Sequence, residues 1–348
     1  MTATLTPVQT RPAAPEPLGR GSLLRAETHR FRSRRFLRLL VLLGAVGFAA
    51  ALVLASTQFA QPSAAGLADA QARLDQVVAE GVRYHQECLT SGEVPSGTSP
   101  EAYCGSAPTA EAYGGPEQFI AKQPFLIGED GLDGALAVAA ATGAFAFLMG
   151  ATWIGAEWSS RSLVALLFWE PRRLRVMAAK LAVLVGATAL VGAAAQAVWA
   201  VAARVLSTTR GDGQVPPELW STLAGTAGRG VLLTVLLGLL GFGLAHLLRG
   251  TAAALGVGFV HLAIVENAVT SVRPAWQEWL LTTNANALVK AGGGRYSVYE
   301  GFFDADGAYQ FAYREHALSN LHGGVVLTVV TLTVVGLGVL LFTRRDLS

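Results

Sequence analysis

The sequence predicts an all-α membrane protein with six transmembrane helices. Of its 348 residues, 52% are hydrophobic and only 14% are charged, which is more apolar surface than an ordinary soluble core can bury. Six apolar runs are also each long enough, at about 1.5 Å per helical residue, to cross a hydrocarbon core of roughly 30 Å. We expect spans at residues 36–57, 132–154, 177–203, 226–248, 251–271 and 323–342.

Lysine and arginine are unevenly distributed between these spans, and this predicts their orientation. Segments on the same side as the N-terminus hold sixteen of the 26 cationic residues and five of the 24 acids, whereas the opposite segments hold ten cations and eighteen acids. Short loops rich in Lys and Arg stay in the cytoplasm. We therefore expect a multi-pass protein of the cell (plasma) membrane with both termini cytoplasmic (tails 1–35 and 343–348).

The N-terminal segment combines two kinds of sequence. Residues 1–18 are rich in Pro, Thr and Ala, which is typical of disorder. Residues 21–38 interleave Leu and Phe with arginines, and this pattern favours a basic amphipathic helix at the inner membrane surface. The alternative is a positively charged flank that only orients the first span.

The first outer segment, 58–131, is the largest piece outside the membrane, and an amphipathic helix is expected at its start. Its apolar stripe recurs at spacings of three and four: Leu67, Ala70, Leu74, Val77, Gly81, Tyr84 and Cys88. The two cysteines, Cys88 and Cys104, flank a Gly-, Ser- and Pro-rich stretch on the side expected to be oxidising. A disulfide is favoured and two free thiols are the alternative; His85 alone does not make a metal site.

The second outer region, 272–322, is expected to be re-entrant or interfacial. Trp276, Trp279, Leu280 and Ala287 suggest a short helix in the interface, where Trp commonly anchors a protein to headgroups. Residues 292–313 show no helical period, so we expect a loop over the outer mouth.

Polar residues within spans are costly, at about 2.5–3.5 kcal/mol for a charge near the bilayer centre. Both a structural role and a lining role in a pathway are open for Gln196, His261, Glu266 and Asn267. On an α-helix, His261 and Glu266 would point about 140° apart, which is poor for a shared metal. With neither HExxH nor GxSxG present, we expect no catalytic or metal-binding residues and no enzyme activity.

The loop 155–176 is short, basic and partly amphipathic. Leu163, Leu166 and Leu167 share one helical side, and Pro171 follows as a helix stop. A cytoplasmic loop containing an apolar helix must pack on headgroups or on a protein, and we favour a protein.

The stretch GAEWSSRSLVALLFWEPRRLRVMAAKLAVL resembles the loop between the second and third spans of ABC-2 type (ABC exporter) transporter permeases, especially actinobacterial ones. The basic N-terminal helix, the six spans and the closing FTRRDL are similar too. The resemblance implies a coupling helix that docks on a separate ATPase subunit through Glu157, Trp158, Ser159, Ser160, Arg161, Ser162 and Leu163. Arg172, Arg173 and Arg175 would lie beside it, at the membrane surface. Arg161 departs from the family, in which a small residue, usually Gly, is common.

The chain lacks the phosphate-binding pattern GxxxxGK[ST], so we expect it to bind no cofactor and to depend on a partner ATPase for ATP and Mg²⁺. The resemblance implies an exporter, in which six spans form half a pathway and pair with a second permease chain, as a homodimer or a heterodimer. The bilayer is the remaining partner, and nucleic acid is not expected. The alternatives are a membrane sensor or assembly protein that recognises its target through residues 58–131, and an intramembrane enzyme.

Overall fold

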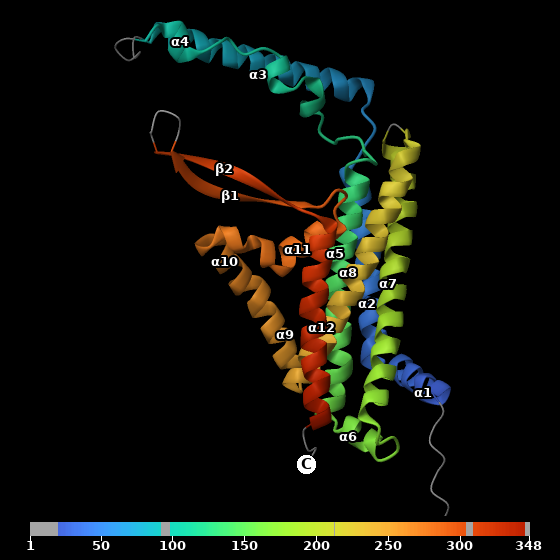
Figure 1. Ribbon diagram of the computed structural model, residues 1–348. Helices are drawn as coiled ribbons and strands as arrows, with labels where there is room; N and C mark the ends of the chain where they lie inside the picture. The colour runs from blue at the N-terminus through green and yellow to red at the C-terminus, as the bar shows by residue number, and fades with distance from the viewer. Residues whose placement is uncertain (1–19, 92–97, 212, 304–308, 345–348) are drawn as a thin grey trace, which may run out of the picture. The chain divides into compact units, whose positions relative to one another are not determined.

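The computed structural model describes residues 20–91, 98–211, 213–303 and 309–344. The expected disordered tail, 1–18, lies outside the described residues, as do Arg345 and the rest of the C-terminus. Within the described part, six helical segments are long and apolar enough to cross a membrane (Figure 1). They are α2 (Arg35–Gln58), α5 (Asp130–Ser159), α7 (Arg173–Arg210), α8 (Pro217–Leu248), the segment Thr251–Val272 and α12 (Asn320–Arg344). Each predicted span falls inside one of these segments.

The fifth segment is not a uniform α-helix. It consists of α9 (Thr251–Val260), the π-helical turn η3 (His261–Val265) and α10 (Glu266–Val272). It follows α8 through a tight turn in which Arg249 has a φ of 56°.

Contacts divide the chain into two compact units. The first unit comprises residues 1–42, 139–193 and 230–348, and the second comprises residues 43–138 and 194–229.

In the first unit, α5 and α8 pack with their backbones in close approach. A Cβ added at Gly150 would lie 2.1 Å from the carbonyl oxygen of Gly238, and one at Gly241 would lie 2.2 Å from that of Phe147. Small residues permit such approach between membrane helices, where dispersion forces and not hydrophobicity hold the helices together. The glycines of the fourth span therefore serve packing within the chain.

The part of the first unit between α10 and α12 runs through η4 (Pro274–Trp279), α11 (Leu281–Val289), β1 (Gly294–Phe303) and β2 (Tyr309–Leu318). The expectation of a loop over 292–313 is wrong, because β1 and β2 form an antiparallel hairpin in which Tyr299 faces Tyr313. Burial alternates along β1: Val298 is buried, while Tyr299 and its neighbours on that face are exposed. The short helix expected near Trp276 is the 3₁₀-helix η4.

The second unit contains α3 (Ala64–Thr90), α4 (Pro100–Cys104), and the 3₁₀-helices η1 (Glu111–Tyr113) and η2 (Pro116–Phe119). Ser63 caps α3 by accepting the Gly66 N–H. Of the expected stripe, Ala70 and Leu74 are buried, and Gly81 lies against Pro108 and Tyr113. The expected disulfide between Cys88 and Cys104 is present, with a Cα–Cα distance of 6.0 Å.

Candidate functional site

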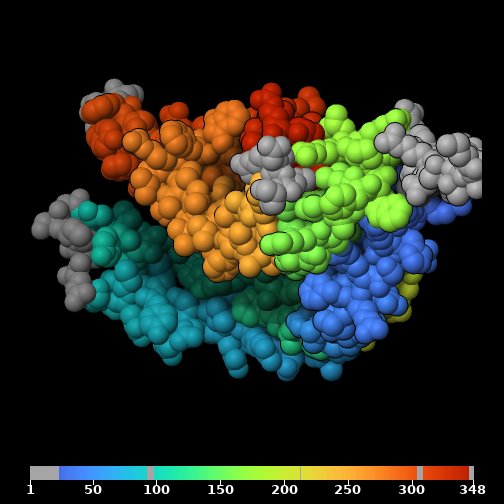
Figure 2. Space-filling model, turned by 90° about the horizontal axis from the view of Figure 1, so that it is seen from below, coloured from blue at the N-terminus to red at the C-terminus, as the bar shows by residue number. Residues whose placement is uncertain are grey.

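The segment that the sequence singles out connects α5 to α7 through a short helix, α6 (Ser162–Leu167). Between Ser159 and Ser162 the backbone reverses at Arg161, whose φ of 54° and ψ of 13° are left-handed. This conformation favours glycine. The glycine that the resembling family commonly has at this position would suit the same turn. In the view from below, the light-green segment that includes α6 lies against the blue N-terminal helices (Figure 2).

The seven expected docking residues divide into an inner and an outer set. Glu157 and Leu163 are buried, with exposed fractions of 2% and 1%. Trp158 is half-buried and donates its indole N–H to His246 Nδ1 at 3.1 Å. The outer set is exposed and consists of Ser159, Ser160, Arg161 and Ser162. A partner can therefore touch the outer set, whereas Glu157 and Leu163 hold the loop in place from within.

Glu157 belongs to a buried ionic cluster that joins three helices. Lys180 on α7 donates to Glu27 Oε2 on α1 (Arg20–Ser33) at 2.6 Å and to Glu157 Oε1 at 3.0 Å. Arg34 adds a contact to Glu157 Oε1 at 2.9 Å, and Arg30 lies 3.3 Å from Glu27. Lys180 and Glu27 are completely buried. Such a cluster requires every charge to be paired, because removing one partner of a buried pair costs about 3–5 kcal/mol.

Aromatic side chains enclose the cluster. The Lys180 ammonium lies 5.2 Å from the centre of the Trp153 ring, and Phe31 of α1 meets the same ring edge-on at 4.9 Å. Arg34 also donates to the Trp153 carbonyl oxygen at 3.3 Å. Because Arg34 is the single residue between α1 and α2, these bonds fix the corner where the N-terminal helix meets the first span.

The three flanking arginines have different environments. Arg173 is partly buried and donates to the Phe342 and Thr343 carbonyl oxygens at 2.7 and 3.3 Å. It therefore supplies a donor to the last turn of α12, where carbonyls lack helical partners. Arg172 is exposed and Arg175 is half-buried.

Two aromatic residues after α6 were not among the expected docking residues. Phe168 and Trp169 are 86% and 79% exposed, more than any other large hydrophobic side chain that the structure describes. They lie in the turn before Pro171, beside the exposed Arg172. Trp, Tyr and Arg are the residues that most often dominate the energy of protein interfaces.

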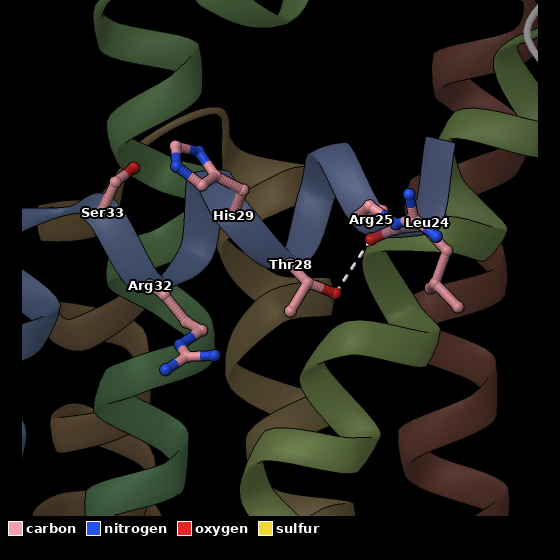
Figure 3. Close-up of a pocket in the computed structure, with 6 residues that line it drawn as sticks. All are labelled: Leu24, Arg25, Thr28, His29, Arg32 and Ser33. Carbon is pink, nitrogen blue, oxygen red and sulfur yellow. Dashed lines mark hydrogen bonds between the residues drawn. The ribbon is translucent and has the colours of Figure 1, made fainter. Parts of the chain in front are cut away.

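The far face of α1 is basic. Leu24, Arg25, Thr28, His29, Arg32 and Ser33 surround a surface hollow on this helix (Figure 3). These residues are exposed, while Leu23 and Glu27 on the opposite side are buried. The amphipathic helix expected from the sequence is therefore present, but its inner face packs on protein through a paired carboxylate.

The polar residues within spans have structural partners. Gln196 is buried and donates to the Ala135 carbonyl oxygen at 3.0 Å. The expectation that His261 and Glu266 point apart is wrong, because η3 is a π-helix, and His261 Nε2 lies 3.2 Å from Glu266 Oε1. Asn267 donates to the carbonyls of Leu262 and Ala263 at 3.3 and 3.1 Å. The Asn267 amide thus supplies the hydrogen-bond donor for two carbonyl oxygens inside the π-helical turn.

Comparison with known proteins assigns no relative. No protein-family model matches the sequence, and no curated protein matches it. Among the described residues, no group of three or more His, Cys, Asp or Glu side chains is arranged to hold a metal ion.

The sequence of α1 itself contains a signal for the ionic cluster. Leu23, Glu27 and Phe31 recur at a spacing of four, so Glu27 lies on the stripe that α1 buries. A carboxylate at such a position needs a cation from elsewhere in the chain. Lys180, near the start of an apolar span, is the residue that supplies it.

Proposed function

We propose that this chain is the transmembrane permease subunit of an ABC-2 type ATP-binding-cassette transporter and that it works as an exporter. A separate ATPase subunit binds ATP and Mg²⁺, and a second permease chain completes the pathway. The proposal rests on the sequence resemblance of the α5–α7 connection and on the build of that connection.

The observation that carries the proposal is that the loop between α5 and α7 is held by buried residues and presents an exposed rim. This rim consists of residues 159–162 and 168–169. Its inner residues, Glu157 and Leu163, are buried, and Lys180 ties the end of α5 to α7 and α1. Ser160 and Arg161 stand outside on the turn. A loop that only joined two spans would not need a buried ionic anchor.

The position of Phe168 and Trp169 favours a protein partner over the lipid surface. Seven residues separate the start of α7 at Arg173 from Lys180, which is about 10 Å along the helix axis. Helix α1 is tied to the chain at Lys180, and a basic amphipathic helix lies at headgroup depth. The two aromatic residues precede Arg173 and so project beyond that depth, where an apolar pocket on a protein suits them.

The mechanism follows from these connections. When two ATPase subunits close on ATP, they push the rim formed by residues 159–162 and 168–169. The ionic cluster passes that displacement to α5, α7 and α1 together, because none of these helices can move separately without breaking a buried ion pair. The spans then rock as bodies between inward-open and outward-open states.

Affinity purification of the tagged chain from its native host, in mild detergent, tests the partner. We expect an ATPase subunit to co-purify in stoichiometric amount. The double variant Phe168→Ser/Trp169→Ser should lose most of it, since hot-spot aromatics each contribute about 2 kcal/mol or more. Phe303→Ser is the matched control, because Phe303 is 72% exposed and lies on the outer hairpin.

The possible results separate the functions. Loss of the ATPase in the double variant alone would support docking at this rim. Equal recovery of the ATPase with the unaltered chain, the double variant and the Phe303→Ser control would mean that the docking surface lies elsewhere on the chain. Repeated purification of the unaltered chain without any ATPase would contradict the transporter and favour a sensor or assembly protein.

A further inference from the structure

Helix α1 carries a basic stripe on the side opposite to the one that packs on protein. Leu23 and Glu27 are buried, whereas Arg25, His29 and Arg32 are exposed. Residues four and seven positions apart on an α-helix share one side. Arg25, His29 and Arg32 therefore form a single stripe that faces away from the ionic cluster.

The basic stripe lacks counter-charges within the described part of the chain. Residues 20–38 contain seven arginines and one acid, Glu27, and this acid is buried against Lys180. No described acidic side chain lies within ion-pair distance of Arg25 or Arg32. Like charges on one side of a helix repel each other, so an anion from outside the chain would stabilise the stripe.

The stripe lies at a depth where phosphate groups are concentrated. Arg34 is the single residue between α1 and α2, the first apolar segment long enough to cross a membrane. Figure 3 shows α1 running across the neighbouring helices and not along them. A helix that lies across the end of a span runs along the membrane surface, at the depth of the lipid headgroups. Phosphates are the anions of that layer, and basic clusters beside a span are typical of sites that bind them.

An apolar hollow of about 200 Å³ lies beside the corner between α1 and α2. It is lined by residues of α2, α5 and α9 and by the corner residue itself: Arg34, Phe36, Leu37, Thr152, Ala156 and Thr251. The two threonine hydroxyls have partners on the backbone, because Thr152 donates to the Leu148 carbonyl oxygen at 2.7 Å and Thr251 to that of Ala151 at 3.5 Å. The hollow therefore offers carbon surface, which suits part of an acyl chain.

We propose that the basic stripe and this hollow together bind an anionic phospholipid. The lipid phosphate accepts hydrogen bonds from the guanidinium groups of the stripe, and one acyl chain enters the hollow beside Phe36. Arg32 is two residues from Arg34, which lines the hollow, so their Cα atoms are at most about 7 Å apart and one molecule can reach both features. A soluble phosphate compound could meet the arginines but would leave the hollow unfilled, and the two features together therefore favour a lipid.

Native mass spectrometry of the full chain in mild detergent tests the site, with phosphatidylglycerol and phosphatidylcholine of the same acyl chains as probes. We expect phosphatidylglycerol to bind roughly tenfold more tightly, because only its headgroup leaves the phosphate charge unbalanced. Arg25→Gln/Arg32→Gln should abolish most of this preference. The matched control is Arg73→Gln/Arg83→Gln, which removes two arginines that are 57% and 62% exposed on α3 and should keep the preference.

Two further measurements distinguish a lipid from a soluble anion. Ala156→Leu, which fills the hollow, should weaken the binding of phosphatidylglycerol while both stripe arginines stay in place. Glycerophosphoglycerol, the same headgroup without acyl chains, should not displace the lipid at equal concentration. Should Ala156→Leu fail to fold, the exposed arginine pair and the chainless headgroup still decide.

Three results would overturn the proposal. Equal binding of the two lipids to the unaltered chain would show that the site does not select anionic headgroups. Equal loss of the preference in the α3 control would show that it reflects net charge alone. Displacement of the lipid by glycerophosphoglycerol at equal concentration would assign the stripe to a soluble phosphate compound.

Discussion

The Lys180 ammonium lies 2.6 Å from the Glu27 carboxylate, although 153 residues separate them in the chain. Both side chains are fully buried, and Lys180 also contacts Glu157. This contact joins the N-terminal helix to the third span at the level of the α5–α7 loop. The stability of the loop thus depends on a residue outside it.

Lys180→Met should be among the most destabilising single changes in the first unit. It leaves Glu27 and Glu157 buried without their shared cation, and breaking such a pair costs about 3–5 kcal/mol. We expect a clear drop in the thermal unfolding midpoint in detergent. Arg30→Gln is the control, because Arg30 is 46% exposed where it meets Glu27 and should contribute about 1 kcal/mol or less. Equal effects of the two changes would argue against a buried cluster.

Comparing Arg161→Gly with Arg161→Ala separates the effect of the backbone turn from the effect of the side-chain charge. Because Arg161 has a φ of 54°, glycine should keep the turn and relieve about 1 kcal/mol of backbone strain. Arg161→Ala removes the charge as well but keeps the strain. ATPase recovery that falls equally in both variants would assign docking to the guanidinium. Normal recovery of the ATPase with both variants would show that the Arg161 side chain does not take part in docking.

Gly150→Ala should destabilise the packing of α5 on α8. The added Cβ would lie 2.1 Å from the carbonyl oxygen of Gly238, and backbone atoms cannot move aside as a side chain can. Overpacking of this kind costs about 1–3 kcal/mol. Gly186→Ala is the matched change within another apolar helix, since nothing lies within 4 Å of its added Cβ. The second variant should unfold at or slightly above the temperature of the unaltered chain, measured by the same thermal scan.

Removal of the disulfide with Cys88→Ser/Cys104→Ser should loosen the packing of α4 on the end of α3 in the second unit. The bond closes a sequence separation of 16 residues, for which the entropic contribution is about 3 kcal/mol. Limited proteolysis should cut the region around residues 88–104 faster in the variant. The single thiol of Cys88→Ser alone should react with a maleimide. Failure of that thiol to react in the denatured chain would indicate a different pairing.

Much of the helical fold could be predicted because the bilayer imposes a simple rule on the sequence. A run of about 20 apolar residues is readable without knowledge of its neighbours, and all six runs coincide with helices. The hairpin was not predicted, because the period-two alternation of a strand does not register as a helical period. Tyr296, Val298 and Glu300 alternate with exposed residues, and an Asp-Gly pair at 306–307 lies between the strands. These are the signals of a hairpin.

The candidate site could be placed in the sequence, but its inner and outer residues could not be told apart. Glu157 carries a charge and adjoins exposed serines, so it looks like a surface residue until Lys180 and Arg34 are placed beside it. The pairing of His261 with Glu266 depends on one π-helical turn, which sequence periodicity does not register. Long-range pairing and local departures from helical geometry are thus what the sequence conceals.

The distance along the chain between Glu27 and Lys180 also matters during synthesis. At about 5–20 residues per second, the 153 residues between them take roughly 8 to 30 s to emerge from the ribosome. During that interval, Glu27 lies on the apolar stripe of the N-terminal helix with only the half-exposed Arg30 of the same helix to pair with it. The helix therefore reaches its final place only after the third span has been made, and a chain truncated before that span would leave it undocked.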